Sequence, residues 1–294
     1  MKKIDLIIPY VNNQDKVWQK TYLDYFQRVN PKLIASLHGQ RYEDIGLINY
    51  QLKLVEKNMP WVNTIYLLLS NKEQCPKYIP NNCKIVYHYQ FIPQKYLPTF
   101  NSTTIEMFLW NIPNLEEYFI YANDDMLPVK PLKPSDFFYG NHIKMNFHKE
   151  EHTKYDSEFK WQCYNSYKHV FDLAPKHISE IMFNNSENEY LRPYHTITPM
   201  IKSHCKECFD QIKDNIFPKI RAWRTMEQHN QYIYPIWDYF FYRVYDSKIN
   251  FFYTHLDEED FKERMEKAQI LCPNVLANKD NIKVLVDYLE SLCE

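Results

Sequence analysis

Residues 118–125 are Tyr118-Phe119-Ile120-Tyr121-Ala122-Asn123-Asp124-Asp125, an apolar run that ends in two adjacent carboxylates. The aromatic and β-favouring residues predict a buried strand. An acidic pair at its exit would lie just outside the carboxyl edge of a sheet, where open α/β folds bind ligands. Neighbouring carboxylates repel each other, and a hard cation such as Mg²⁺ would keep both ionised beside a phosphate-bearing substrate. Because Asp and Asn also favour solvated turns, these residues alone leave a turn and a metal site both open.

The first 125 residues alternate predicted strands with predicted helices. Short β-favouring runs predict strands over residues 4–11, 64–70, 84–89 and 118–122. Apolar spacing predicts helices from Val17 towards Arg28 and over residues 44–58, and Thr103 with Glu106 predicts a capping box that opens a third helix. Such alternation implies an α/β fold of Rossmann or GT-A-like type, with a mostly parallel central sheet covered on both faces.

The pattern changes beyond about residue 140. Residues 142–195 are rich in His, Lys, Asn and Tyr and have poor periodicity, which predicts an irregular insertion over the site. The remaining segments predict helices over 199–217, 226–245, 257–270 and 277–290, and a final strand over 248–255. We therefore expect an α/β core over residues 1–140 and an irregular, helical lobe over 141–294, which share one cleft and together form one domain.

Composition limits the classes of function. The net charge is −2, and no basic tract is present that would hold a nucleic acid. Three glycines among 294 residues leave room for neither a GxGxxG nor a Walker A motif. The chain has no long apolar run and no start typical of a signal peptide, which predicts a cytoplasmic protein. Seven cysteines fit a reduced compartment, and Cys205-Lys206-Glu207-Cys208 after His204 is weak evidence for zinc.

Two polar segments upstream of the acidic pair could contact a ligand. Asn101 and Ser102 offer an amide, a hydroxyl and backbone N–H groups at a predicted helix start, which is a natural anion site. Their alternative role is to cap the helix and nothing more. Arg41 and Asp44 stand just ahead of another predicted helix and could orient a substrate. A pair of exposed side chains would give the same pattern.

Two further segments lie downstream of the acidic pair. His195 could act as a general base because the pKa of histidine lies near neutrality, yet it is one of eleven histidines. Arg221 and Arg224 place two guanidinium groups before a predicted helix, and the fork geometry of arginine suits phosphate oxygens. Exposed arginines are common, so each signal is weak alone and gains weight only as part of one pattern.

Several motifs follow one another between roughly residues 4 and 245. They are Arg41-Tyr42-Glu43-Asp44-Ile45-Gly46-Leu47, Val55-Glu56-Lys57-Asn58-Met59-Pro60-Trp61-Val62, Leu97-Pro98-Thr99-Phe100-Asn101-Ser102, Ile105-Glu106, Phe119-Ile120-Tyr121-Ala122-Asn123-Asp124-Asp125-Met126, Arg192-Pro193-Tyr194-His195 and Arg221-Ala222-Trp223-Arg224-Thr225, with Asn230-Gln231 after the last. This ordered set resembles the Stealth proteins. These are sugar-1-phosphate transferases of bacterial capsule synthesis, similar to the catalytic part of animal GlcNAc-1-phosphotransferase.

The chain departs from the family pattern at two places. The first family region carries an aspartate and a glycine where this chain has Asn12 and Asn13, although Asp15 and Trp18 remain. Gln228 stands where many members have an acidic residue. A charged role for the first aspartate is therefore lost, and Asp124 and Asp125 would carry most of the charge that faces a metal ion.

The resemblance implies transfer of a sugar-1-phosphate from a nucleotide-sugar to a hydroxyl of an acceptor saccharide, which forms a phosphodiester and releases a nucleoside monophosphate. It implies that the core over residues 1–140 binds the donor and that Asp124 and Asp125 hold Mg²⁺ or Mn²⁺ or contact the donor. By the same resemblance, the catalytic residues are Asp125, His195, as the base or as an acid that contacts phosphate, and Arg224 as the phosphoryl clamp. The implied substrate-binding residues are Asn123, Asn101, Ser102, Arg41, Asp44, Arg221 and Asn230.

The implied partners are a nucleotide-sugar, with a UDP-sugar first among donors, and an oligo- or polysaccharide acceptor. Peripheral association with the capsule assembly machinery at the inner face of the cell membrane is also implied, although no strongly amphipathic basic helix is present to anchor the chain. Two alternatives stay open. A metal-dependent glycosyltransferase of GT-A type also places an acidic pair at a strand end, and would release a nucleoside diphosphate. A non-catalytic carbohydrate-binding protein would bind sugar without turning over any donor.

Overall fold

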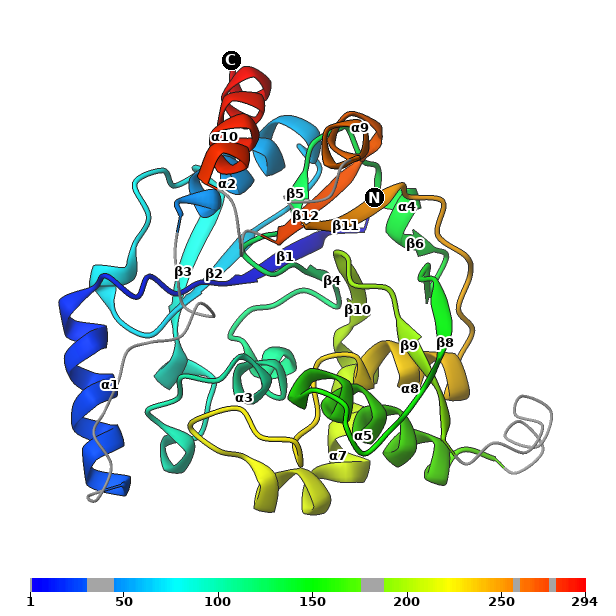
Figure 1. Ribbon diagram of the computed structural model, residues 1–294. Coiled ribbons are helices and arrows are strands. Elements are labelled where there is room, and N and C mark those ends of the chain that lie inside the picture. The colour runs from blue at the N-terminus through cyan, green and yellow to red at the C-terminus, as the bar shows by residue number, and fades with distance from the viewer. Residues whose placement is uncertain (1, 31–44, 176–187, 256–259, 275–278) are drawn as a thin grey trace.

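The computed structural model describes residues 2–30, 45–175, 188–255, 260–274 and 279–294 (Figure 1). A five-stranded sheet in the order β10-β4-β1-β2-β3 forms its centre. Its strands are β1 (Ile4–Pro9), β2 (Ile65–Leu69), β3 (Cys83–Tyr87), β4 (Tyr118–Tyr121) and β10 (Thr198–Ile201). The first four run parallel, and β10 pairs antiparallel with β4. The predicted α/β fold with a mostly parallel central sheet is confirmed.

Both faces of this sheet are covered, as the continuous apolar run of β2 and the largely apolar β1 require. One face, with Leu6 and Leu67, packs against α2 (Leu47–Asn58). The opposite face, with Leu68 and Phe119, packs against α5 (Glu158–Leu173), α7 (Lys202–Ile216) and α8 (Ile233–Phe241). Figure 1 shows α2 on one side of the sheet and α5, α7 and α8 on the other. The side chains of successive strand residues therefore enter two separate cores.

The segment 142–195 is more regular than we predicted. It contains β8 (Phe147–Glu151), which pairs antiparallel with β9 (Glu189–Pro193), and the long helix α5. The inner face of α5 is partly polar, with Gln162 and Ser166 both buried. Gln162 Nε2 donates to Thr225 O at 2.8 Å, and Asn230 N donates to Ser166 Oγ at 3.0 Å. Because polar side chains make these contacts, the apolar periodicity that indicates a helix is weak.

A second, three-stranded sheet was not predicted. It has the order β11-β12-β5, from β11 (Phe251–His255), β12 (Ile270–Asn274) and β5 (Leu127–Pro128). The last strand of the chain is therefore β12, and not the segment 248–255. The two closing helices are shorter or shifted relative to the prediction: α9 spans Phe261–Lys267 and α10 spans Lys279–Cys293. β12 is short and contains a proline, and both features weaken the sequence pattern that indicates a strand.

Two helix boundaries were also wrong. The helix predicted over 199–217 begins at Lys202, because Thr198–Ile201 is the edge strand β10, all four residues of which are buried. The helix predicted over 226–245 is shorter in the structure, where α8 spans only Ile233–Phe241. The remaining elements are α1 (Lys16–Val29), α3 (Ser102–Glu106), α4 (Pro134–Phe137), β6 (Phe138–Tyr139), β7 (His142–Ile143) and single 3₁₀ turns at 72–74, 88–90, 94–96, 109–111 and 217–219.

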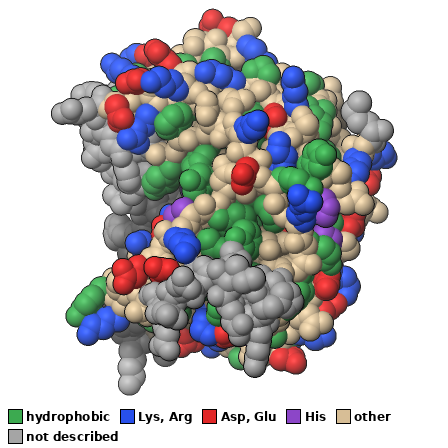
Figure 2. Space-filling view, turned by 90° about the vertical axis from the view of Figure 1, so that its right-hand side faces the viewer, with side chains coloured by type: hydrophobic (Ala, Val, Ile, Leu, Met, Phe, Trp, Pro, Cys, Tyr) green, Lys and Arg blue, Asp and Glu red, His purple; other side chains and the backbone are tan. Residues whose placement is uncertain are grey.

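The surface carries charges of both signs. Figure 2 shows one face on which acidic and basic side chains are intermingled, in keeping with a net charge of −2. Among the described helices, none combines the length and the apolar character that crossing a membrane requires.

Candidate active site

A cavity of about 670 Å³ opens at the carboxyl ends of the parallel strands. This volume lies within the usual range of ligand sites. Its walls come from segments that are far apart in the sequence: residues 9–11 at the end of β1, residues 99–103, 105 and 106 around α3, the turn 123–125 after β4, residues 192, 194 and 195 at the end of β9, Arg224, residues 230–231, and Phe251 and Tyr253 of β11. The position agrees with the general rule for ligand sites in open α/β sheets.

The acidic pair lies in a tight turn between β4 and β5. The N–H of Met126 donates to the carbonyl of Asn123 at 3.1 Å and closes the turn. Gln51, fully buried on α2, donates from Nε2 to the carbonyls of both Asn123 and Met126, each at 2.7 Å. Immediately after the turn, Leu127 pairs with Leu271 of β12. The turn that carries the two carboxylates is thus held by α2 on one side and by β12, a strand near the end of the chain, on the other.

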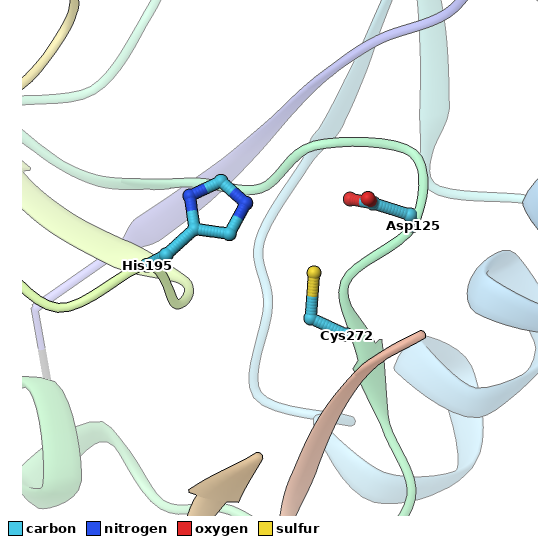
Figure 3. Close-up of side chains that lie close together, drawn as sticks. All are labelled: Asp125, His195 and Cys272. Atoms are coloured by element: carbon cyan, nitrogen blue, oxygen red, sulfur yellow. The ribbon is translucent and has the colours of Figure 1, made fainter. Parts of the chain in front are cut away.

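Asp125 points into a polar cluster that sequence analysis did not predict. One potential metal-ligand atom from each of Asp125, His195 and Cys272 lies within 4.8 Å of the other two (Figure 3). Burial raises the pKa of Asp125, while His195 and a hydrogen bond with the Cys272 thiol oppose that shift. The buried oxygen Oδ1 of Asp125 has no hydrogen-bond partner among the described residues. A buried acceptor without a donor fits a cation, so the residues present suit a metal ion beside this turn.

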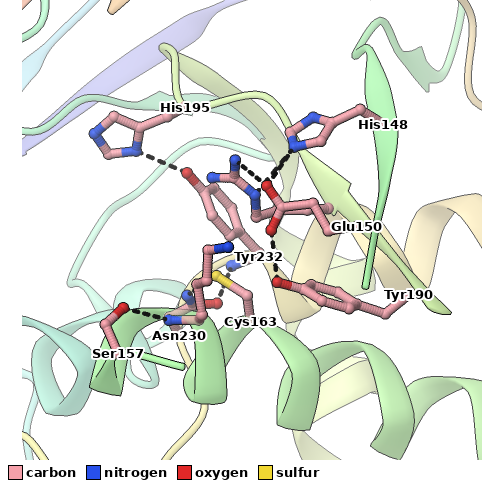
Figure 4. A network of polar contacts seen from close by, with 10 residues as sticks. His148, Glu150, Ser157, Cys163, Tyr190, His195, Asn230 and Tyr232 are labelled. Atoms are coloured by element: carbon pink, nitrogen blue, oxygen red, sulfur yellow. Dashed lines mark hydrogen bonds and ion pairs between the residues drawn. The ribbon is translucent and has the colours of Figure 1, made fainter. Parts of the chain in front are cut away.

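The surroundings of His195 favour the neutral form of its imidazole. Its Nδ1 is 2.7 Å from the hydroxyl of the buried Tyr232, on the helical side of the cavity (Figure 4). Burial lowers the pKa of His195, and the nearby cations Arg192 and Arg224 lower it further, against the opposing charge of Asp125. A neutral ring with Nδ1 engaged leaves Nε2 as the nitrogen that can exchange a proton with a ligand.

Arg192 is a cavity residue to which sequence analysis gave no role, although it belongs to the quoted motif at 192–195. Its Nη2 donates to Glu150 at 2.6 Å, its Nε lies 3.1 Å from His148 Nε2, and Tyr190 donates to the other Glu150 oxygen at 2.7 Å (Figure 4). Burial raises the pKa of Glu150, but these hydrogen bonds and the arginine charge outweigh it and bring the pKa to about 2. The ionised Glu150 therefore fixes the guanidinium at the cavity wall.

The helix start at Asn101 differs in detail from the prediction. Asn101, not Thr103, is the N-cap: its Oδ1 accepts from Thr103 N at 3.1 Å, and its Nδ2 donates to Gln228 at 2.9 Å. The capping box was wrong because the helix begins one residue earlier than Thr103 and ends at Glu106. The buried Glu106 instead accepts from Gln231 N at 2.8 Å, and its carboxylate lines the cavity. Its place in the Ile105-Glu106 motif was the signal that could have indicated a site role.

The structure brings most of the predicted site residues to one cavity. Those that line it are Asn101, Ser102, Asn123, Asp124, Asp125, His195, Arg224 and Asn230. Arg224 Nη2 donates to Ser102 Oγ at 2.5 Å, which joins two of the predicted segments. Arg221 is exposed and does not line the cavity; its Nη1 donates to the carbonyls of Pro218 and Ile220. Arg41 and Asp44 lie outside the described residues.

Fold and site together define a Rossmann- or GT-A-like α/β protein with a polar ligand cavity at the carboxyl edge of its parallel strands. Residues 41–146 match the model of conserved region 2 of the Stealth proteins. The chain is 31% identical over 221 residues to a capsular polysaccharide phosphotransferase of Neisseria meningitidis serogroup B, a match that covers 72% of this chain and 57% of that protein.

Two further relatives give shorter matches. A capsular polysaccharide phosphotransferase of Haemophilus influenzae is 40% identical over 147 residues, which cover 49% of this chain and 40% of the relative. A receptor polysaccharide phosphotransferase of Streptococcus oralis is 35% identical over 141 residues, covering 47% and 42%. The chain thus spans about half the length of the curated relatives it matches. It belongs to the Stealth family.

Proposed function

We propose that the chain transfers a sugar-1-phosphate from a nucleotide-sugar to a hydroxyl of an acceptor saccharide, in the synthesis of a bacterial capsule or another surface polysaccharide. The similarity to phosphotransferases of capsular and receptor polysaccharides supports this class of reaction. The observation that carries the proposal is that the acidic turn, His195 and Arg224 all line one cavity. A UDP-sugar is the first donor to test, and the acceptor is an oligo- or polysaccharide.

The reaction joins the acceptor oxygen to the β-phosphorus of the donor and breaks the bond from that phosphorus to the bridging oxygen. The nucleoside monophosphate leaves with the bridging oxygen, and the acceptor hydroxyl loses a proton. His195 is placed to take this proton on Nε2, because Nδ1 is engaged by Tyr232 and burial keeps the ring neutral.

The reaction also requires that the negative charge on the donor phosphates be neutralised. Arg224, fixed against Ser102, would clamp the transferring phosphoryl group, since its guanidinium matches phosphate oxygens. Asp124 and Asp125 would hold Mg²⁺ or Mn²⁺, which neutralises diphosphate charge when bound. Asp125 Oδ1, which has no hydrogen-bond partner in the part of the chain that the structure describes, supports this assignment. Asn123, Asn101 and Asn230 would orient the donor from the same walls.

The two departures from the family pattern, at Asn12 and Gln228, do not affect the groups that this chemistry uses. Asn12, which replaces a family aspartate, is not among the residues that line the cavity, and its Oδ1 accepts from Gln14 N at 2.8 Å. Gln228 accepts from both Asn101 and Thr103 and so supports the helix start. Neither substitution removes a group that the proposed transfer uses. Association with the capsule assembly machinery at the membrane is part of the same proposal.

The products provide the test. The protein is incubated with UDP- and GDP-sugars, a divalent metal and short capsular oligosaccharides, and the nucleotide released is identified by chromatography. We expect the monophosphate, with a phosphodiester signal in the ³¹P NMR spectrum of the product. Release of the diphosphate would instead establish a GT-A glycosyltransferase, and sugar binding without turnover under any metal would establish a carbohydrate-binding protein.

A matched pair of variants connects the test to the cavity. Arg224→Ala removes a guanidinium from the cavity wall, while Arg221→Ala removes an exposed one three residues away in the same segment. We expect only the first to lose transfer. Equal effects of the two would contradict the assignment of the phosphoryl clamp to Arg224.

A further inference from the structure

Three potential metal-ligand atoms of different chemical types lie close together at the acidic turn. They are a carboxylate oxygen of Asp125, a ring nitrogen of His195 and the thiol sulfur of Cys272, all within 4.8 Å of one another. The three side chains come from separate segments and point towards a common space (Figure 3). We propose that this cluster binds a transition-metal ion of the Zn²⁺ type, held by one oxygen, one nitrogen and one sulfur.

The surroundings of each donor favour such a site. The main chain around Asp125 is fixed by Gln51, and its Oδ1 is buried without a hydrogen-bond partner among the described residues. Tyr232 can accept the Nδ1–H of His195, which leaves the Nε2 lone pair for a metal, as is usual for ligating histidines. Cys272 is buried in β12, between β11 and β5.

The distances are compatible with tetrahedral coordination. Zinc bonds of 2.0–2.3 Å place neighbouring ligand atoms about 3.3–3.8 Å apart. Atoms now up to 4.8 Å apart therefore need to approach by roughly 1 Å, which side-chain rotation can supply. Three protein ligands leave a fourth position open to water or to an incoming group.

The donor set selects the type of metal. Mg²⁺ takes oxygen ligands, whereas imidazole and thiolate suit Zn²⁺ and its neighbours in the first transition row. The sequence draws attention to Cys205 and Cys208 instead, yet among the described residues this pair is not part of a group of three potential ligands. Within the part of the chain that the structure describes, the Asp125 cluster is the only group of three or more such donors.

The metal site stands on geometry alone, and only its effect on turnover rests on the proposed function. Asp125 and His195 are the residues that the proposed transfer uses as metal ligand and base. A Zn²⁺ ion on Asp125, His195 and Cys272 would occupy both residues, so Zn²⁺ would compete with Mg²⁺ and inhibit transfer.

Binding is tested with Co²⁺, which reports sulfur ligation by its absorption. Metal-free, reduced protein is titrated with Co²⁺ in the absence of any nucleotide-sugar. We expect a sulfur-to-cobalt charge-transfer band in the near ultraviolet that Zn²⁺ abolishes. Cys272→Ala should remove the band, and Cys208→Ala, which removes a buried cysteine of α7 outside the cluster, should keep it. Tyr232→Phe should weaken Zn²⁺ binding by about tenfold to a hundredfold.

The outcomes separate this proposal from the proposed function. A wild-type protein without the band, or a folded Cys272→Ala variant that keeps the band at full intensity, would overturn the metal site whether or not the protein transfers sugar-phosphate. Should Cys272→Ala fold poorly by circular dichroism, Cys272→Ser and His195→Ala serve in its place, and both should weaken the band. A Cys272-dependent band in a protein that turns over no donor would support the metal site and count against the proposed function alone.

Discussion

Gln51→Met tests whether α2 positions the acidic turn. The substitution keeps the length of the side chain and removes the Nε2 group that donates to Asn123 and Met126, each at 2.7 Å. Gln51 Oε1 has no hydrogen-bond partner among the described residues, so no acceptor contact is lost with it. Each carbonyl loses one hydrogen bond, although that of Asn123 keeps the N–H of Met126. At about 1–1.5 kcal/mol for each lost hydrogen bond, the unfolding free energy should fall by about 2–3 kcal/mol. The melting temperature should fall by roughly 5 °C.

The catalytic consequence should be larger than the loss of stability suggests. Displacement of a reacting group by about 1 Å costs about a hundredfold in rate, so we expect transfer to fall by about tenfold to a hundredfold when Asn123, Asp124 and Asp125 are released. Asn58→Leu is the matched control. Asn58 lies on the same helix and donates to Pro128 O at 2.7 Å, beyond the turn.

Both variants are compared by thermal unfolding and by release of nucleoside monophosphate at a temperature where each is folded. Asn58→Leu should lose about 1–1.5 kcal/mol of stability and keep its turnover within about twofold. If Gln51→Met loses stability while its turnover stays as close to wild type as that of Asn58→Leu, the reasoning that the α2 amide places the carboxylates is refuted.

Further predictions concern the site and the pH dependence of stability. Asp125→Asn, His195→Ala and Arg224→Ala should each lower transfer by more than about a hundredfold with the circular dichroism spectrum unchanged; near-normal turnover in any of them removes that residue from the mechanism. EDTA should abolish transfer and Mg²⁺ or Mn²⁺ should restore it, whereas full turnover in chelator would exclude a metal role. Burial lowers the pKa of His88 to about 4 and that of His229 to about 3, below the unfolded value of 6.5. Since the unfolded chain then binds protons that the folded chain does not, the unfolding free energy should fall as the pH drops below about 6.5. Thermal unfolding between about pH 7.5 and about pH 5 should show a shallower dependence for His88→Gln than for wild type; parallel curves would contradict the assignment.

The sequence was sufficient to predict the four parallel strands of the central sheet because the sheet is covered on both faces, whereas its antiparallel edge strand β10 was missed. A strand such as Ile65–Leu69 is buried at every position and gives a continuous apolar run. The acidic turn could be placed at the sheet edge for the same reason, since β4 precedes it directly. Local patterns are informative where burial is uniform along an element.

Elements whose contacts are polar or distant could not be predicted. The inner face of α5 uses Gln162 and Ser166 to hold residues 225–230, so its apolar periodicity is weak. Cys272 was not predicted as a site residue, because Asp125 and His195, which lie beside it in space, are far away in the sequence. The strand that carries it, β12, was not predicted either. Most of the predicted site residues nevertheless met in one cavity, because the family motifs mark the segments that form its walls.

The pairing of Leu127 with Leu271 also sets an order of events during synthesis of the chain. The carboxylates of the turn leave the ribosome about 140 residues before the strand that anchors them. At 5–20 residues per second this delay is roughly 7–30 s. The strands β1, β2, β3 and β4 are complete by residue 121 and can pair during that interval. The nascent chain can therefore form this parallel sheet before the site is complete, because the turn pairs with β12 only after residues 270–274 have been synthesised.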